Sequence, residues 1–294
     1  MRVAVIDRKD IRIKAERSAL KFDGETLPFG LMDMLVINHR VDLSSRDILK
    51  LNEADISLLI VSHNNRNLSL LNSANTKNGA LRLAQYNALG DRLKIAKYFI
   101  AQKVRTHAEH LSYFDTQLPI DSVLDEIEQC GSVESLIGIE GTFAKAYFKV
   151  YFSLFPKDFR VTKRSKNPPK DPLNALLSFW YSLYYHIITV KLLSMGFDPA
   201  IGYLHVPFRT HNALSSDFIE IFRAEINHAV LGLFVNGLLE KSDFSYKGGG
   251  VYLKFEGRKK IWQSFVDLIG VLNPKLSQEI ANIRAMIEGR DEKV

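Results

Sequence analysis

Three short segments of the chain carry side chains that could do chemistry. The first runs from Gly138 to Gly141, where Glu140 is a single acid between glycines inside an otherwise apolar helical stretch. A glycine in a helix interior costs about 1 kcal/mol relative to alanine. Two glycines beside one carboxylate therefore suggest that a ligand approaches the backbone closely here. The alternative is a crossing of two helices with an exposed glutamate at residue 140.

The second and third segments contribute an imidazole and two more carboxylates. His205 follows an apolar run and lies two residues before Pro207. Asp217 and Glu220 are three residues apart, and Arg223 is three residues further on, so these side chains share one face of an expected helix. Each segment also has an ordinary interpretation: a buried histidine with its hydrogen bonds satisfied, or an amphipathic helix with a row of surface charges.

Glu140, His205 and Glu220, with Asp217 adjacent, together provide hard oxygen ligands and one imidazole. Such a set suits Mg²⁺ or Mn²⁺, and the imidazole favours manganese. Zinc also accepts histidine and carboxylates, so the types of ligand alone leave the metal open.

The distribution of positive charge is compatible with a polyanionic partner. The chain has 39 Lys plus Arg and 33 Asp plus Glu, a formal net charge of +6. Two basic clusters stand out: Lys157, Arg160, Lys163, Arg164, Lys166 and Lys170, then Lys254, Arg258, Lys259 and Lys260. Such clusters bind phosphates with release of counterions, although charge alone fits solvated surface segments equally well. A divalent ion beside them favours phosphodiester chemistry, in which a metal polarises the phosphate.

Other catalytic signatures are missing from the sequence. His107 and His110 are only three residues apart, so they do not form an HExxH zinc motif and are expected on a solvated helix face. Glu225 and His228 resemble half of a di-iron site whose second half is absent. A single cysteine excludes an intramolecular disulfide framework.

The elements that must position these residues change in type near residue 70. Short apolar or alternating runs predict strands up to that point, and helical periodicity dominates from residue 80. The expected helices cover 80–111, 120–129, 133–155, 172–196, 215–238, 259–272 and 274–287, with a small hairpin at 244–255. The fold class is therefore α+β: a small β-rich domain over residues 1–70, a linker over 71–79, and a larger, mostly α-helical catalytic domain over 80–294.

The most apolar stretch, Leu173–Met195, is not expected to cross a membrane. Asn174, His186 and Lys191 lie within it, and polar or charged groups inside a span are costly. A buried helix is the better interpretation. Because no targeting segment is visible either, the expected location is the cytoplasm, without a membrane partner.

The motifs, in this order, resemble those of the CRISPR-associated adaptation integrase and endonuclease family. The resemblance is strongest in Leu136–Phe148 (LIGIEGTFAKAYF), Pro168–Tyr181 (PPKDPLNALLSFWY) and Phe197–Arg223 (FDPAIGYLHV…DFIEIFR). It is weaker in Leu81–Asn87 (LRLAQYN) and Gly250–Lys260 (GVYLKFEGRKK). Several motifs separated by dissimilar sequence make this a specific signal that covers essentially the whole chain.

The resemblance implies a role for individual residues. Glu140, His205 and Glu220 match the family's metal-binding positions and would hold Mn²⁺ or Mg²⁺. Asp217 matches a neighbouring catalytic acid that ligates the metal or acts behind its ligands. The DNA contacts expected from the basic positions are those of Arg160, Lys163, Arg164, Arg209 and Arg223.

The resemblance also implies an activity and partners. Members of the family join the 3′-hydroxyl ends of captured double-stranded DNA to the ends of a CRISPR repeat by transesterification. With water as the nucleophile, the same site would be a metal-dependent DNA endonuclease. A homodimer, formed with help from the β-rich domain, and a small ferredoxin-like adaptation protein are the implied partners. Two alternatives stay open: a non-catalytic DNA-binding subunit of the adaptation complex, and a repair nuclease that acts on branched DNA.

Overall fold

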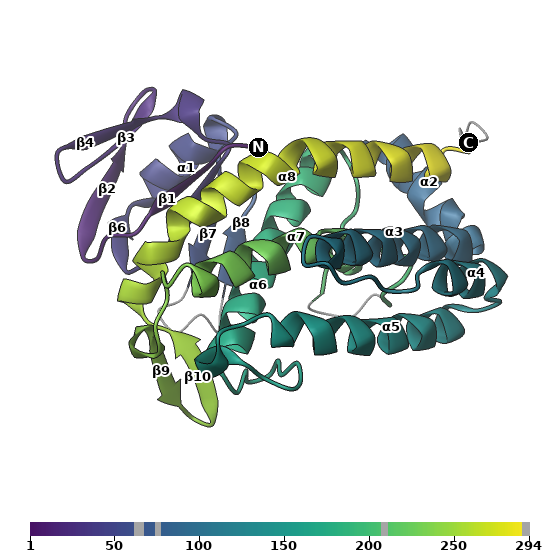
Figure 1. Ribbon diagram of the computed structural model, residues 1–294. Helices are drawn as coiled ribbons and strands as arrows, with labels where there is room; N and C mark the ends of the chain where they lie inside the picture. Colours follow the sequence, from purple (N-terminus) through teal and green to yellow (C-terminus); the bar gives the residue numbers. More distant parts are fainter. Residues whose placement is uncertain (62–67, 74–77, 207–210, 290–294) are drawn as a thin grey trace.

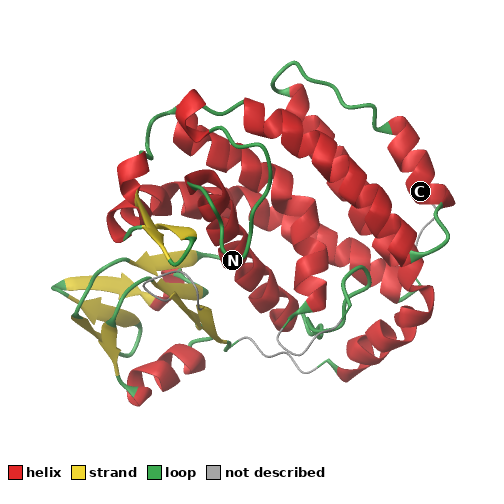
Figure 2. Ribbon diagram, turned by 90° about the horizontal axis from the view of Figure 1, so that it is seen from below, coloured by secondary structure: helices red, strands yellow, loops and turns green. Residues whose placement is uncertain are grey.

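The chain folds into a β-rich N-terminal part and a larger helical part, which confirms the predicted α+β class. The computed structural model describes residues 1–61, 68–73, 78–206 and 211–289. Strands of the N-terminal part gather at one side of the molecule, and helices fill the rest (Figures 1 and 2).

Two four-stranded sheets form the N-terminal part, with the orders β1-β5-β7-β8 and β4-β3-β2-β6. The strands are β1 (Val3–Ile6), β2 (Ile11–Ala15), β3 (Ala19–Phe22), β4 (Glu25–Pro28), β5 (Met34–Ile37), β6 (Val41–Leu43), β7 (Ser57–Val61) and β8 (Leu68–Leu71). β5 pairs in parallel with both β1 and β7. All four of its residues are buried, as expected for an apolar strand that is covered on both faces.

The helical part is built around two long apolar helices. The α-helices of the described residues are α1 (Ser45–Glu53), α2 (Gly79–Asn87), α3 (Arg92–Ser112), α4 (Asp121–Gln129), α5 (Val133–Ser153), α6 (Pro172–Ser194), α7 (Ala213–Val235) and α8 (Phe255–Ile287). α6 and α7 are buried over most of their length and pack against each other, and α7 also packs along α3. α3 in turn contacts α5, so these helices form a continuous packed layer (Figure 1).

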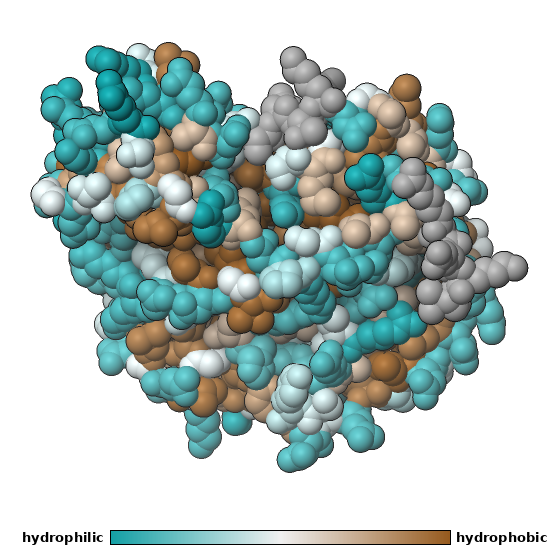
Figure 3. Space-filling view, turned by 90° about the horizontal axis from the view of Figure 1, so that it is seen from above, coloured by the Kyte–Doolittle hydropathy of each residue, from teal (hydrophilic) through white to brown (hydrophobic). Residues whose placement is uncertain are grey.

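The apolar segment over residues 173–195 is the buried helix that the sequence predicts. Trp180, Leu176 and Leu183 on α6 are each 0% exposed. Within the described ranges, no helix is both long and apolar enough to span a bilayer. The face seen in Figure 3 is mostly hydrophilic, with apolar side chains in separate patches.

Two predictions about the helices are wrong. The helix expected over 80–111 is interrupted at Ala88–Asp91, a short 3₁₀ turn that contains Gly90. The two closing helices are one, because α8 continues through Pro274. A proline removes one backbone hydrogen bond, but apolar side chains on both sides of it, including Leu272 and Leu276, stay buried along one face of the helix. Packing therefore outweighs the local break.

The small hairpin predicted near residues 244–255 is confirmed as β9 (Phe244–Lys247) paired with β10 (Gly250–Leu253). Its β10 strand contacts α6. The strand β8 lies at the end of the predicted β-rich domain, and α2 begins at Gly79. The linker expected over 71–79 stays a prediction, since residues 74–77 are outside the described part of the chain.

Candidate metal and nucleic-acid site

Glu140, His205 and Glu220 line one pocket, although 80 residues of sequence separate the first from the last. The pocket has a volume of about 490 Å³ and lies between α5, the middle of α7 and the segment over residues 154–171. This segment carries the first basic cluster and is called the basic loop below. Seven cationic side chains also line it: Lys103, Lys145, Lys149, Lys163, Arg164, Lys166 and Arg223. The pocket is therefore strongly positive except at its two carboxylates.

Helix α5 places Glu140 on its inward side. Leu136, Phe143 and Tyr147 are buried at helical spacing on the same stripe, and Glu140 falls between them. The glycines on either side of it meet nothing within 4 Å where a Cβ would stand. Among the described residues, no neighbouring helix therefore packs closely on Gly138 or Gly141, and the approach of a ligand to this backbone stays a prediction.

Lys103 on α3 connects the two carboxylates. Its ammonium bonds Glu140 Oε1 and lies 2.5 Å from Glu220 Oε2, and its side chain is only 6% exposed. The sequence analysis did not single out this residue. The available signal was its position on the apolar stripe of α3, between buried Ile100 and His107, where a lysine needs an anionic partner.

Glu220 is held at both carboxylate oxygens. Arg223 Nη2 bonds Oε1 at 2.8 Å, while Oε2 faces Lys103. Burial alone would raise the pKa of Glu220, but the positive charges of Arg223 and Lys103 outweigh it and hold the pKa well below its usual range. Glu220 is therefore negatively charged at neutral pH, with Oε1 bonded by Arg223 and Oε2 by Lys103.

Asp217 organises the segment that carries His205. Its Oδ2 accepts hydrogen bonds from the backbone N–H groups of Tyr203 at 2.6 Å and Leu204 at 3.1 Å. Its Oδ1 accepts from the backbone N–H of His205 at 2.9 Å and lies 2.8 Å from the ring Nδ1. A carboxylate on Nδ1 fixes the imidazole and leaves Nε2 for a ligand, a common arrangement behind metal-binding histidines. The structure thus places Asp217 behind His205.

Gly202 is the glycine that this turn requires. A Cβ at residue 202 would stand 2.8 Å from Asp217 Oδ2 and 2.7 Å from the backbone carbon of Ala213. The close approach of backbone to carboxylate explains why a glycine precedes the aromatic residue and the histidine in this motif.

Two arginines predicted to bind DNA are used inside the protein. Arg164 bonds the side chains of Asn174 at 2.8 Å and Ser178 at 2.9 Å. Arg223 bonds Glu220 and lies 4.5 Å from the centre of the Tyr181 ring. Their placement makes them positioning groups for the loop and for Glu220, while contact with DNA stays a prediction.

The other predicted contacts lie at the surface or outside the described residues. Lys163 and Arg160 are exposed on the basic loop, and Arg209 falls in the segment 207–210, which the structure does not describe. Lys145 and Lys149, one turn apart on α5, add exposed cations that the sequence analysis did not select. The sequence feature that could have indicated them is their spacing: two lysines four residues apart lie on one face of the helix that carries Glu140.

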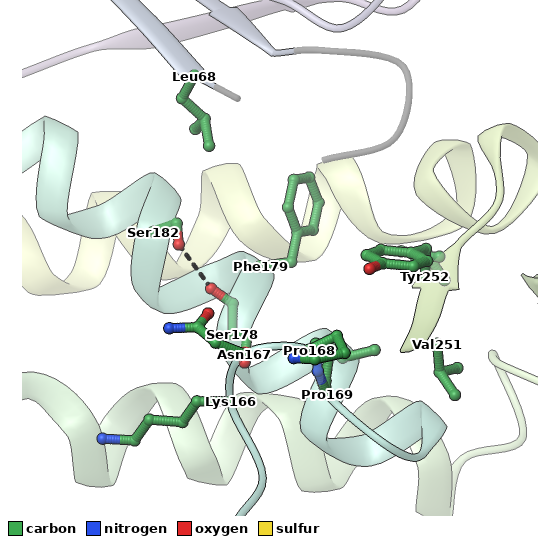
Figure 4. A pocket seen from close by; sticks show the side chains of 12 residues that line it. Leu68, Lys166, Asn167, Pro168, Pro169, Ser178, Phe179, Ser182, Val251 and Tyr252 are labelled. Atoms are coloured by element: carbon green, nitrogen blue, oxygen red, sulfur yellow. Dashed lines mark hydrogen bonds between the residues drawn. The ribbon is translucent and has the colours of Figure 1, made fainter. Parts of the chain in front are cut away.

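The basic loop is braced by the β9-β10 hairpin. Val251 N donates to Pro169 O at 2.9 Å, and Lys170 Nζ donates to Gly249 O at 2.7 Å. A second pocket of about 360 Å³ lies between this loop, α6 and β10, as Figure 4 shows. Lys166 lines both pockets; desolvation of its ammonium and the nearby Arg223 and Arg164 lower its pKa. The hairpin thus fixes the loop beside the acidic pair.

The two histidines of α3 are buried, so their predicted solvated position is wrong. His107 Nδ1 lies 2.8 Å from Lys103 O, and His110 Nδ1 lies 2.7 Å from the Tyr147 hydroxyl. Asn227 Nδ2 donates to the same hydroxyl at 2.9 Å, and Asn227 Oδ1 accepts from Tyr181. α3 packs against α5 and α7, and this packing buries both rings. The residue spacing within α3 alone does not reveal such contacts.

The donor set has the chemistry of a site for a hard divalent cation. Two carboxylates already share one buried cation, the Lys103 ammonium, and an oriented imidazole lines the same pocket. In the described part of the chain, no group of three or more His, Cys, Asp or Glu residues is arranged to hold a metal ion. Metal binding by Glu140, His205 and Glu220 therefore stays a prediction.

Comparison with known proteins gives consistent matches over nearly the whole chain. Residues 4–267 match the family model described as CRISPR associated protein Cas1. A CRISPR-associated endonuclease Cas1 of Thermodesulfovibrio yellowstonii is 33% identical over 285 residues, which cover 89% of each chain.

Two solved structures have the same fold. A Cas1 protein from Thermotoga maritima matches with a TM-score of 0.90 at 20% identity, covering 98% of this chain and 97% of that one. A casposase bound to its integration product matches with a TM-score of 0.88 at 22% identity, covering 100% and 92%.

Proposed function

The chain belongs to the Cas1 family of CRISPR adaptation integrases and endonucleases, and from that premise we propose a metal-dependent DNA strand transferase. It joins the 3′-hydroxyl ends of captured double-stranded DNA to the ends of a CRISPR repeat. One observation carries the proposal: two carboxylates share a single cation in a pocket that is also lined by His205 and by six further basic side chains.

Glu140, Glu220 and His205 would hold the metal, Mn²⁺ or Mg²⁺. When bound, such an ion polarises the phosphate and stabilises the leaving oxygen of a phosphodiester exchange. The protein's own residues prepare the ligands. Arg223 fixes one oxygen of Glu220 and Asp217 fixes the ring of His205, so the donors left for a metal are Glu220 Oε2, which Lys103 bonds here, and His205 Nε2.

The DNA backbone fits the exposed rim of the pocket. Lys145 and Lys149 on α5 face the same space as Lys163 and Lys166 on the loop. Each phosphate that these lysines neutralise releases counterions, which supplies affinity without regard to sequence. Gly141 also lines the pocket, and the open space where its Cβ would stand leaves room for a backbone to approach this helix closely.

The partners implied by the family are part of the proposal. The fold is also found in a solved Cas6-RT-Cas1–Cas2 complex, which matches with a TM-score of 0.79 at 20% identity over 99% of this chain and 35% of that one. We therefore expect this protein to assemble with a second copy of itself and with a small ferredoxin-like adaptation protein.

The test replaces one ligand while keeping its shape. Glu140→Gln should lower strand transfer into a repeat-bearing plasmid in Mn²⁺ by about 100-fold or more, because several kcal/mol of charge stabilisation by the metal are lost. DNA binding, measured by fluorescence anisotropy, should be retained. The matched control is Glu134→Gln, an exposed glutamate two turns earlier on the same helix.

Unchanged joining by the Glu140→Gln protein would contradict the proposal. That result, together with intact DNA binding, would favour the alternative of a DNA-binding subunit whose chemistry is done elsewhere in the complex.

A further inference from the structure

Lys103 is a buried cation with no place in the predicted metal site. It projects from α3, while the acids that it bonds project from α5 and α7. The backbone carbonyl of Lys103 is held by His107, and Thr106 bonds the backbone of α7, so the helix itself is fixed. Any movement at this point belongs to the lysine side chain, whose flexible stem has four carbons.

The groups that are ion-paired at Lys103 balance in charge without a metal. Glu140 and Glu220 contribute two negative charges, and Lys103 and Arg223 contribute two positive ones. Of the two cations, only Lys103 contacts both acids. The oxygens that it bonds, Glu140 Oε1 and Glu220 Oε2, are the pair that would face a shared ion. A divalent cation added beside an unmoved Lys103 would repel it at close range.

The pocket provides space for a displaced ammonium. Lys103 itself lines the cavity of about 490 Å³, together with Glu140, Glu220 and His205. Arg223 lines the same cavity, but it bonds Glu220 Oε1 and lies over the Tyr181 ring. Both cations therefore border open space, and they differ in their partners: Lys103 bonds the two oxygens that a metal would use, whereas Arg223 does not.

We propose that Lys103 is an internal counter-ion that occupies the metal position in the metal-free protein and is displaced into the pocket when a divalent cation binds. The inference rests on the proposed function, since it takes Glu140 and Glu220 as metal ligands. Its consequence is that Lys103 weakens metal binding and keeps the two acids together until the metal arrives.

The first experiment uses the unaltered full-length protein. Acetylation of lysines by an N-hydroxysuccinimide ester is followed by mass spectrometry, with and without MnCl₂ at a concentration shown by calorimetry to saturate binding. Lys103 should be protected without the metal and acetylated several-fold faster with it. Lys94, exposed on α3 outside this pocket, should react at the same rate in both samples.

The two possible failures are distinguishable. If Mn²⁺ binds but the acetylation rate of Lys103 does not change, Lys103 is not displaced and the inference is overturned. If calorimetry detects no Mn²⁺ binding at all, the proposed metal-dependent function fails first.

A substitution gives an independent measurement. Lys103→Met keeps a side chain of similar length and removes the charge. Mn²⁺ should then bind about tenfold more tightly or better, because no ammonium competes with the ion for the two carboxylates. Lys94→Met, on the exposed side of the same helix and outside this pocket, is the matched control and should leave the dissociation constant within about twofold of the unaltered protein. Equal or weaker binding by a folded Lys103→Met protein would overturn the inference.

Discussion

At the scale of single residues, the site is built from acids that are each held by a neighbour. Glu220 is fixed by Arg223, His205 by Asp217, and Glu140 by Lys103. Buried charges without such partners are costly, so every member of the set depends on another. The chemistry of the pocket therefore depends on these three paired contacts and not on single side chains.

The sequence revealed the acids more readily than the bases. Glu140 and His205 stand out because their types suit a metal and their surroundings are unusual for a helix or a loop. Lys103 looks like an ordinary helical lysine until α3 packs between two acid-bearing helices. Arg164 was counted with the DNA-binding charges, because composition cannot distinguish a free guanidinium from one that bonds Asn174.

Gly202 gives the prediction at this scale. Gly202→Ala should lower the free energy of unfolding by about 1–3 kcal/mol, because the new Cβ meets Asp217 Oδ2 and the backbone of Ala213 at under 3 Å. Urea unfolding measures the change. The control, Gly138→Ala, meets open space inside α5 and should stabilise the protein by up to about 1 kcal/mol. Equal stability of the two variants would contradict the packing described for the His205 segment.

At the scale of elements, helical periodicity predicted most of the helices because each has one apolar face. It failed where tertiary packing overrides a local signal, as at Pro274, and where a short turn interrupts a periodic stretch, as at Ala88–Asp91. Short strands such as Val41–Leu43 carry too few residues for a pattern. The strand Val41–Leu43 (β6) forms because it pairs in parallel with the neighbouring strand β2.

Helix α3 also shows that the buried and exposed faces of a helix cannot always be assigned from the sequence of that helix alone. His107 and His110 were assigned to solvent, yet α5 and α7 cover them. Burial lowers the pKa of His107 and, with the nearby His228, lowers that of His110 to about 3. Both rings are thus uncharged in the folded protein at neutral pH.

His110 contributes a defined part of the pH dependence of stability, beside His107 and His186, whose pKa values burial also lowers. The unfolded chain takes up this proton near pH 6.5 and the folded protein only near pH 3, so stability falls as the pH drops below 6.5. Between pH 7 and pH 5 the loss from His110 should be about 2 kcal/mol. His110→Gln should remove that part of the pH dependence in urea unfolding, whatever its effect at pH 7.

The control for this prediction is His228→Gln, at an exposed position near the same ring. It should keep most of the slope. An unchanged slope in the His110→Gln protein would mean that His110 does not stay neutral in the fold.

At the scale of the whole molecule, the order of motifs along the chain was sufficient to indicate the family. The same order does not reveal which charged side chains face outward, since that depends on how α3, α5, α6 and α7 pack. The packed helices leave a basic rim around an acidic pair, and the hairpin fixes the basic loop at its edge. Partners and symmetry lie beyond a single chain and rest on the family.

The position of the metal tests the account most directly. Crystals of the protein with Mn²⁺ and a short DNA duplex, measured at the manganese absorption edge, should show one anomalous peak in contact with Glu140, Glu220 and His205 Nε2. The DNA backbone should lie across Lys149 and Lys163. A peak elsewhere, or none at saturating Mn²⁺ with DNA bound in the pocket, would contradict the claim that these side chains form one metal centre.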